Sequence, residues 1–556
     1  MGRVGTAAAA LLPLWLATVG GIQKPQQPAG ATVRASVDSN GDEADGDSWT
    51  AAISADGRFV VFSSDADDLV ANDTNQKTDV FVHDLQAGTT VRVSVDSSGN
   101  EGDRASNNVA ISADGRFVAF TSHATNLVPG DANNATDVFV HDLAGGTTER
   151  VSVDSVGNEA DAESPNDVAL SADGRFVAFQ SAADNLVAKD GNAAVDVFVH
   201  DRATRTTERA SVDSNGGEVD GGSVTAALSA DGMLVAFGSD ATNLVAGDTN
   251  QLHDVFLHDR ASGLTERVSV DASGLQLKQE SRAPVLSADG LVVAWYGGGG
   301  ANASDVFARD RAKQTTECMS VDSAGVAGNG SSYLPVISGD GRFVAFHSFA
   351  SNLVAGDTNR WYDVFVRDRS KGATQRASLS SSDAEADNGS ITGGISGDGS
   401  RIAFLSYATN LVTGDTNLLN DVFVREICVV DASWANYGTG WPGTFGVPSL
   451  TAQNNPVLGS KLNVDLENSS GLFSVTLFLV GYQQASLHSS LGGDLLLIPS
   501  TAALLLLPPG GTTLATLLPS DVSLAGFEID SQALETDLGA TKGVSFTAGL
   551  QMILGG

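Results

Sequence analysis

An acidic motif that could hold a cation recurs six times in this chain of 556 residues. Each copy places an aspartate, an asparagine and a second aspartate in the spacing Asp-x-Asn-x-x-x-Asp. Calcium binds hard oxygen atoms from carboxylates, amides and backbone carbonyls, and the first two positions match the start of an EF-hand-type loop. The spacing therefore predicts calcium loops at Asp73/Asn75/Asp79, Asp131/Asn133/Asp137, Asp190/Asn192/Asp196, Asp248/Asn250/Asp254, Asp357/Asn359/Asp363 and Asp415/Asn417/Asp421.

The same residue types also have a purely structural explanation. Asp and Asn side chains bond their own backbone in tight turns, and each copy of the motif needs a turn at this point. The motif lacks the bidentate glutamate and the glycine of an EF-hand loop. A seventh segment keeps Asp305 before Val306 and Phe307, although its loop has shrunk to residues 297–304. The last aspartate is therefore predicted to be structural in every copy, whereas calcium binding and turn stabilisation both stay open for the other residues.

Histidines offer less chemistry, because four of them occupy one repeat position that holds arginine elsewhere. Exchange with arginine predicts a partly exposed cationic side chain beside an aspartate, and it does not suit a metal ligand or a catalytic base. The histidines at this position are His83, His141, His200 and His258, and the arginines are Arg309, Arg367 and Arg425.

Known catalytic signatures are missing from the sequence. There is no Gly-x-Ser-x-Gly elbow, His-Glu-x-x-His helix, phosphate loop or dinucleotide fingerprint. The two cysteines, Cys318 and Cys428, are too few for a cysteine-rich metal site, and we expect two free thiols rather than a bridge. No catalytic residue is assigned.

Seven Ser-x-Asp-Gly turns show which elements must position the acidic motifs. Neighbouring turn aspartates are 58, 59, 58, 58, 51 and 58 residues apart, which indicates a repeat architecture. In the second repeat, strands are predicted at 109–112, 116–120, 137–141 and 148–153. Four short antiparallel strands are typical of one β-propeller blade. The turn aspartates are Asp56, Asp114, Asp173, Asp231, Asp289, Asp340 and Asp398.

The two ends of the repeat region predict how the ring closes. The last repeat stops after its third strand at 421–424, and a lone fourth strand, residues 32–38, precedes the first repeat. An N-terminal strand that completes the last blade removes the free edge of an open array. We therefore predict an all-β fold: a seven-bladed β-propeller closed by an N-terminal strand, followed by a small β-sandwich. Two long acidic loops of each repeat would share one face of the propeller: the loop between the second and third strands (the 2–3 loop) and the loop from the fourth strand to the first strand of the next repeat (the 4–1 loop).

Composition and the chain start point to an exported protein. A net charge of −36 argues against a nucleic-acid partner and favours a basic or cation-bridged one. Arg3 followed by an apolar run resembles a signal peptide, and Pro13 argues against a transmembrane anchor. The predicted parts are a signal peptide at 1–21, a linker at 22–30, the propeller at 31–426 and a C-terminal β-sandwich module at 427–556.

The repeat resembles the TolB-type, WD-like propeller repeat of exported bacterial proteins. The resemblance rests on Ser-x-Asp-Gly-Arg-Phe-Val-Ala-Phe followed by Asp-Val-Phe-Val-x-Asp, across about residues 31–426. TolB itself has six blades, so its envelope-assembly role is not carried over to seven repeats. Residues 437–459 with the closing 550–555 resemble a C-terminal module of secreted planctomycete and myxobacterial proteins.

Three functions follow as expectations. The first is a non-catalytic binding scaffold whose acidic loop face holds a protein or glycan partner, with calcium as the one cofactor considered. The second is a hydrolase or lyase that acts on an extracellular polysaccharide or peptide in the propeller funnel. The third is a structural component of the cell surface. Each implies export to the periplasm, the outer surface or the medium.

Overall fold

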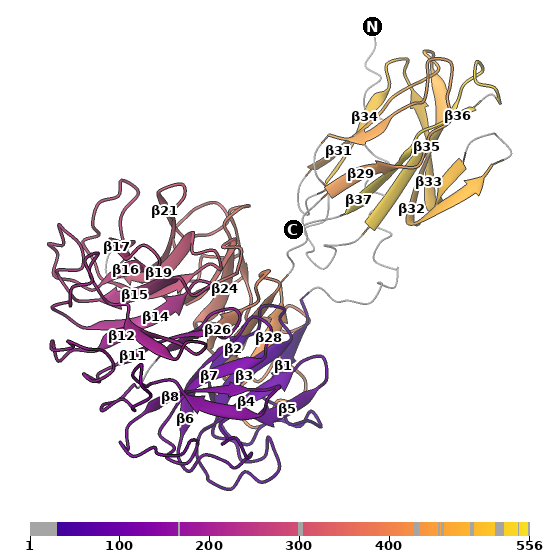
Figure 1. The fold of residues 1–556 in the computed structure, drawn as a ribbon. Helices are drawn as coiled ribbons and strands as arrows, with labels where there is room; N and C mark the ends of the chain where they lie inside the picture. Colours follow the sequence, from indigo (N-terminus) through magenta and orange to yellow (C-terminus); the bar gives the residue numbers. More distant parts are fainter. Residues whose placement is uncertain are drawn as a thin grey trace. The chain divides into compact units, whose positions relative to one another are not determined.

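The computed structural model describes residues 30–164, 167–298, 304–427, 433–453, 456, 461–489, 494–517, 528–542 and 544–553. Every regular element in these residues is a β-strand (Figure 1). No helix within the described residues is long and apolar enough to cross a membrane. The chain divides into a unit of residues 30–427 and a second unit that includes residues 428–556. The predicted signal peptide and nearly all of the predicted linker lie outside the described residues.

Seven four-stranded antiparallel sheets make up residues 30–427. In six of them the four strands follow one another along the chain, from an inner strand that lines a common cavity to an outer strand. The seventh sheet takes its outer strand from the start of the unit: β1 (Thr32–Arg34) pairs with β28 (Asp421–Glu426), with Val33 opposite Val424.

The strands of the seven sheets are short and similar in length. The inner strands are β2 (Ser48–Ile53), β6 (Ser106–Ile111), β10 (Val168–Leu170), β14 (Ser223–Leu228), β18 (Ser281–Leu286), β22 (Ser332–Ile337) and β26 (Ser390–Ile395). The second strands are β3 (Phe59–Ser64), β7 (Phe117–Ser122), β11 (Phe176–Ser181), β15 (Leu234–Ser239), β19 (Val292–Gly298), β23 (Phe343–Ser348) and β27 (Arg401–Ser406). The other third strands are β4 (Asp79–Asp84), β8 (Asp137–Asp142), β12 (Asp196–Asp201), β16 (Asp254–Asp259), β20 (Ser304–Asp310) and β24 (Asp363–Asp368). The other outer strands are β5 (Thr89–Arg92), β9 (Thr147–Arg150), β13 (Thr206–Arg209), β17 (Leu264–Arg267), β21 (Thr315–Cys318) and β25 (Ala373–Arg376).

Both faces of each sheet are buried, as the alternation of large and small residues along the second strand predicts. In β7, Val118, Ala119 and Phe120 are all fully buried. Phe120 stacks on Phe139 of β8 with ring centroids 5.9 Å apart. Neighbouring sheets share these cores, and the seventh sheet packs on the first through Val422 and Val424.

The Ser-x-Asp-Gly turns join the sheets to one another. In the second sheet, Ser112 Oγ donates to Asp114 and accepts from the backbone N–H of Phe117. Gly115 has φ 74°, and a Cβ on it would lie 2.1 Å from the ring of Phe59 in the first sheet, so only glycine fits here. Backbone hydrogen bonds of 2.8–3.1 Å pass from turn to turn and return to the first: Ala55 to Ala113, Ala113 to Ala172, Ala172 to Ala230, Ala230 to Ala288, Ala288 to Gly339, Gly339 to Gly397 and Gly397 to Ala55.

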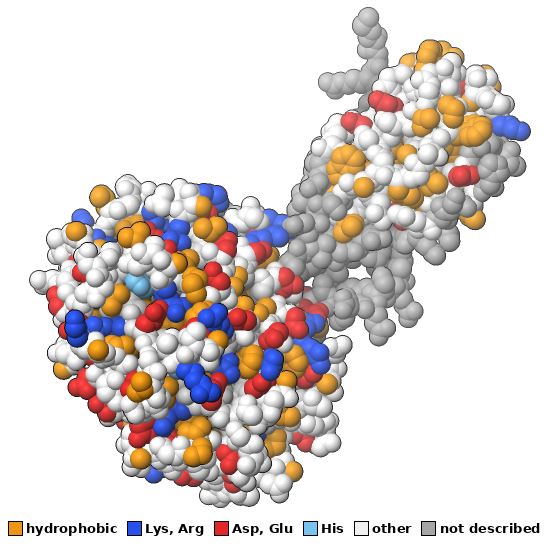
Figure 2. Space-filling model, in the orientation of Figure 1, with side chains coloured by type: hydrophobic (Ala, Val, Ile, Leu, Met, Phe, Trp, Pro, Cys, Tyr) orange, Lys and Arg blue, Asp and Glu red, His pale blue; other side chains and the backbone are white. Residues whose placement is uncertain are grey.

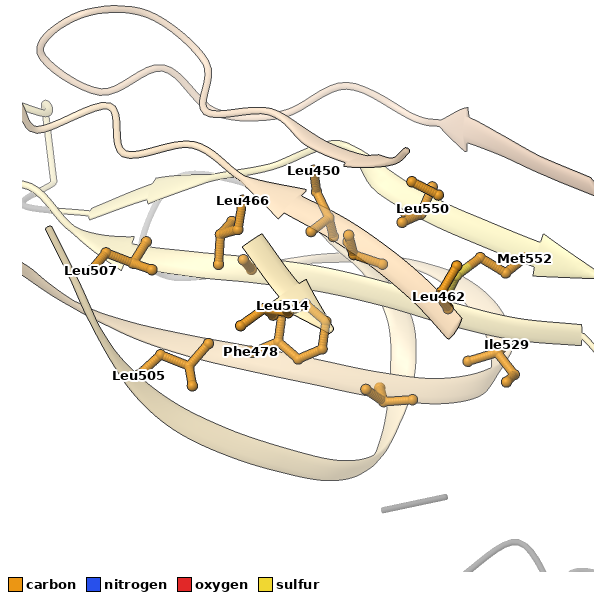
Figure 3. Close-up of a cluster of buried hydrophobic side chains, with 14 residues drawn as sticks. Leu450, Leu462, Leu466, Phe478, Leu505, Leu507, Leu514, Ile529, Leu550 and Met552 are labelled. Carbon is orange, nitrogen blue, oxygen red and sulfur yellow. The ribbon is translucent and has the colours of Figure 1, made fainter. Parts of the chain in front are cut away.

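Two sheets that share one apolar core form the described part of the C-terminal unit (Figure 3). Leu462 and Leu514 from one sheet meet Phe478 and Leu550 from the other. The larger sheet contains β29 (Ser433–Tyr437), β37 (Gly549–Ile553), β35 (Glu528–Thr536), β32 (Ser474–His488), β33 (Asp494–Leu507) and β36 (Val544–Phe546). The smaller one contains β30 (Leu450–Ala452), β31 (Lys461–Leu466) and β34 (Thr512–Leu517).

Candidate functional site

The Asp-Asn loops lie between the second and third strands of six sheets, and the second sheet shows their common geometry. Asn133 closes a turn, because its side-chain oxygen accepts the N–H of Ala135 at 2.8 Å. Its amide nitrogen donates to Asp137 at 3.2 Å and to the carbonyl of Ala160 in the 4–1 loop at 2.9 Å. The two long loops are therefore bonded to each other on one face of the sheet.

The asparagines are the predicted calcium ligands that this geometry supports least. In all six loops the side-chain oxygen accepts the backbone N–H two residues further on, at 2.7–3.0 Å, and the amide nitrogen donates to a carbonyl of the 4–1 loop. These contacts agree with the alternative of turn stabilisation, and because an amide oxygen keeps a second lone pair, a ligand role for the asparagines stays a prediction. The six asparagines are Asn75, Asn133, Asn192, Asn250, Asn359 and Asn417.

The last aspartate of the motif begins the third strand and is buried in every sheet that keeps the motif. Asp137 is fully buried, and its carboxylate accepts a 2.5 Å hydrogen bond from Ser152 Oγ. Ser152 Oγ in turn accepts the N–H of Val138. The fifth sheet lacks the motif but keeps the same bond, from Ser320 to Asp305 at 2.7 Å. This geometry agrees with the structural role predicted for the last aspartate.

An arginine from the outer strand lies among the acidic groups of each cluster. In the second sheet Arg150 Nη1 lies 3.5 Å from Asp131, 3.2 Å from Asp137 and 2.8 Å from Glu159. The same arrangement of an arginine with two aspartates and a glutamate or glutamine recurs in six sheets. The clusters are Arg34 with Asp415, Asp421 and Glu43; Arg92 with Asp73, Asp79 and Glu101; Arg150 with Asp131, Asp137 and Glu159; Arg209 with Asp190, Asp196 and Glu218; Arg267 with Asp248, Asp254 and Gln276; and Arg376 with Asp357, Asp363 and Glu385.

One guanidinium does not neutralise three carboxylates. Burial, reinforced by the charge of Asp137, raises the pKa of Asp131 to about 6, although Arg150 acts in the opposite direction. Burial also raises the pKa of Asp137, against the hydrogen bond from Ser152. Asp131 Oδ1 is buried and has no hydrogen-bond donor among the described residues. The cluster therefore keeps an excess of negative charge in a largely dry environment.

This donor set fits calcium only in part. Carboxylate oxygens of Asp131, Asp137 and Glu159 lie within 4.8 Å of one another, and calcium prefers such hard oxygens. The Asn133 oxygen is held by its turn, and the Arg150 guanidinium lies at the position that a shared cation would take. Calcium binding would thus require the arginine to move, and calcium at these loops stays a prediction.

Two sheets depart from the common cluster. In the fourth, Gln276 replaces the glutamate, and its amide donates to Asp248 at 2.7 Å and to Asp254 at 3.1 Å. In the fifth, where the Asp-Asn loop is lost, Cys318 stands in the arginine position and Ala327 in the glutamate position. Cys318 is a free thiol whose pKa is raised by burial. Cys428 lies outside the described residues.

The arginine and the glutamate are functional neighbours that sequence reasoning missed. They lie outside the Asp-Asn loop, on the outer strand and in the 4–1 loop, so no local motif joins them to it. A signal was nevertheless present: both residues disappear together in the one repeat that loses the loop. Correlated loss within the repeats would have identified the cluster.

The four repeat histidines are buried, so the prediction of partly exposed cations was wrong. His141 is 6% exposed, and its Nδ1 lies 2.9 Å from the hydroxyl of Thr148. The third strand lies inside the sheet with neighbouring sheets on both faces, which removes the ring from water. Burial lowers the pKa of each of these histidines. In two of the arginine repeats the side chain is buried as well, at Arg309 and Arg425.

A second candidate site is the cavity of about 550 Å³ that all seven inner strands line. Its lining is mainly apolar, with Ala, Val, Leu, Ile and Pro side chains. Among the described residues that line it, Asp167 is the one ionisable side chain.

Seven four-stranded sheets joined through their turns around a central cavity define a β-propeller. No protein family and no curated protein matches the sequence. Solved structures similar in fold include TolB from Acinetobacter baumannii, at 16% identity over 54% of this chain and 59% of that one, with a TM-score of 0.34. TolB from Agrobacterium tumefaciens aligns at 16% identity over 52% of this chain and 84% of that one, with a TM-score of 0.34.

The β-propeller domain of the trilobed protease from Pyrococcus furiosus aligns at 12% identity, over 68% of this chain and 95% of that one, with a TM-score of 0.40. The chain spans 59% of the length of the Acinetobacter protein. Likeness this distant assigns no activity. The fold therefore rests on the sheet topology, and the function rests on the site residues.

Proposed function

We propose that the protein is an exported, non-catalytic binding scaffold, a closed seven-bladed propeller whose acidic loop face holds a basic or cation-bridged partner. The C-terminal β-sandwich module would be carried on the same chain. The observation that carries the proposal is a set of exposed carboxylates on the loop face that have no cation of their own. The carboxylates of the six arginine clusters already share an arginine. The exposed carboxylates outside those clusters are therefore the ones available to a partner.

In two sheets, two exposed aspartates of the loop face lie close to each other. Asp67 N–H donates to Asp45 at 3.1 Å, and the charge of Asp45 raises the pKa of Asp67. Asp184 stands in the same relation to Asp161, with its N–H 3.2 Å from that carboxylate and its own pKa raised. All four side chains are exposed, and none of them forms an ion pair with a described residue.

The second sheet shows the uncharged alternative. There Thr125 takes the place of Asp67, and its hydroxyl donates to Asp103 at 2.8 Å. The fold therefore accepts a neutral residue at this position, and the paired carboxylates are not needed to close the loops. A basic partner or a bridging cation would relieve their repulsion and gain affinity that falls as salt rises. Figure 2 shows Asp and Glu side chains over the visible surface of this unit.

The test compares wild-type protein with the fourfold variant D45N/D67N/D161N/D184N. Both are immobilised and incubated with envelope extract at low salt, with calcium and with a chelator in separate arms. We expect a partner that wild type retains, that 0.5 M salt releases and that the variant does not retain.

The control variant removes the same number of charges from the outer strands, at glutamates that already pair with an arginine: E149Q/E208Q/E266Q/E317Q. It should retain the partner, because these four carboxylates lie outside the loop face. Equal retention by all three proteins would refute an acidic binding face.

A further inference from the structure

One residue breaks the repeat inside the central cavity. In six sheets the turn aspartate follows the serine at the start of the inner strand by eight positions, as from Ser106 to Asp114. In the third sheet it follows by nine, from Ser164 to Asp173, which accounts for the repeat step of 59. Among the described lining residues, this sheet alone contributes a carboxylate, Asp167, to the cavity wall.

Asp167 faces the cavity without a cationic neighbour. Its side chain is exposed to the cavity, and no Lys, Arg or His among the described residues pairs with it. Thr225 of the fourth sheet donates a hydrogen bond to it, and burial raises its pKa. The other described lining residues carry no charge, so a carboxylate that ionises here is poorly compensated.

The backbone beside Asp167 has a left-handed bulge that recurs at Asn108, Ala283 and Leu334 of other inner strands. Thr225 has φ 53°, a left-handed value that is costly for a β-branched residue. A bulge between Val224 and Ala227 imposes it, and Gln180 accepts the Thr225 N–H at 3.0 Å.

At the equivalent position the fifth and sixth sheets present hydrocarbon, whereas the first, second and seventh present Thr50, Asn108 and Thr392. Leu334 of the sixth sheet takes the position equivalent to Thr225 and is 45% exposed, and Ala283 takes it in the fifth sheet. Pro284 and Pro335 follow them on the lining. A ligand here meets one carboxylate, uncharged polar groups and the hydrocarbon of Ala283 and Leu334.

We propose that this cavity binds a primary alkylammonium group, the lysine side chain of an extended partner segment, with the ammonium on Asp167 and the methylene stem against Ala283 and Leu334. The Thr225 hydroxyl already donates to this carboxylate, and a compact ammonium needs only one of its oxygens. The acidic surface of the protein favours the approach of a cation.

The inference deepens the proposed function, since the lysine would belong to the basic partner, but model compounds test it without that partner. Calorimetry on the full chain at pH 7.5 uses Nα-acetyl-lysine methylamide, its norleucine analogue, its arginine analogue and pentane-1,5-diamine. We expect one saturable site for the lysine compound and at least tenfold weaker binding of the norleucine analogue, and equal or tighter binding of the arginine analogue would overturn the assignment to an ammonium group. Stronger binding of the diamine alone would assign the site to a free amine and overturn the lysine assignment.

Asp167→Asn is the decisive variant, because it keeps size and removes charge at a position that water reaches. Glu163→Gln is its matched control, since Glu163 lies four residues before Asp167, is exposed and does not line the cavity. D167N should weaken binding of the lysine compound at least tenfold and E163Q less than twofold, with both melting within 1 °C of wild type. Equal affinity for D167N and wild type, or no saturation by 20 mM, would overturn the inference. D167N leaves Asp45, Asp67, Asp161 and Asp184 of the loop face unchanged. A negative result for D167N can therefore be distinguished from a negative result for the binding function proposed for that face.

Discussion

Replacing Arg150 by methionine should destabilise the propeller by leaving a buried acidic cluster without its cation. The arginine side chain is 9% exposed, and Asp131 and Asp137 are 2% and 0% exposed. Removal of one partner from a buried ion pair costs about 3–5 kcal/mol. Glu159, at 25% exposure, keeps part of its hydration, so we expect the lower end, about 3 kcal/mol.

That loss converts to a measurable shift of the melting temperature. The unfolding entropy is about 2.1 cal/mol/K per residue, hence roughly 0.8 kcal/mol/K for a unit of residues 30–427 that melts as one. R150M should therefore melt about 4 °C below wild type at pH 7.5 in differential scanning calorimetry. Arg282→Met removes an exposed pair with Glu280 and is the control, with an expected shift below about 1 °C.

Two further arms identify charge as the cause. Lowering the pH to 5 protonates the uncompensated carboxylates, so the deficit of R150M should shrink. Calcium at 5 mM should restore at least half of the deficit, because three carboxylates within 4.8 Å are then free of the guanidinium, and it should shift wild type much less. An R150M protein that melts within 1 °C of wild type would refute the argument that charge holds the loops together.

Three other predictions follow from the same geometry. The melting temperature should rise by a few degrees when the pH is lowered from 7.5 to 5. Four carboxyls have a pKa raised from 3.8 to about 6 in the folded protein, so the folded state binds protons more readily than the unfolded chain in this range. Stability is therefore lost as the pH rises through 6. These carboxyls are Asp73, Asp131, Asp190 and Asp415. Below pH 4 stability should fall again, because Arg58 and Arg116 lower the pKa of Asp84 and Asp142 to about 2. A melting temperature that stays constant from pH 3 to 8 would contradict both statements. Ser152→Ala leaves the Oδ1 atom of buried Asp137 without its donor and should cost about 1–3 kcal/mol by urea unfolding. Removal of residues 1–34 deletes β1 and exposes the edge of β28, so light scattering should show concentration-dependent association that wild type lacks.

The sequence pattern predicted the strands well because the same local preferences occur in each of the seven repeats. The third strand at 137–141 and the strand at 116–120 in the second repeat correspond to β8 and β7 within a residue or two. The role of the last aspartate was also accessible, since Asp305 survives where its loop does not. Local reasoning sufficed wherever the partner lies in the same strand pair.

Prediction failed where the partner lies in another element. Arg150 and Glu159 are 19 and 28 residues beyond Asp131 in the sequence, on a different strand and a different loop, so no spacing rule connects them. The burial of His141 depends on the neighbouring sheet, which a single repeat does not reveal. Asp167 was visible only as a step of 59 instead of 58, and its position on the cavity wall needed the structure.

Features common to the seven sheets stabilise the ring, whereas a feature found in one sheet can bind a ligand in one orientation. The turn-to-turn hydrogen bonds and the serine–aspartate bond recur from sheet to sheet because each interface needs them. A ring of identical sheets would present the same wall in seven directions and could not fix the orientation of an asymmetric ligand on its axis. Asp167 removes that equivalence, since it places the only charge among the described lining residues on one wall. A side chain that binds Asp167, as proposed above, would then enter the cavity in one orientation.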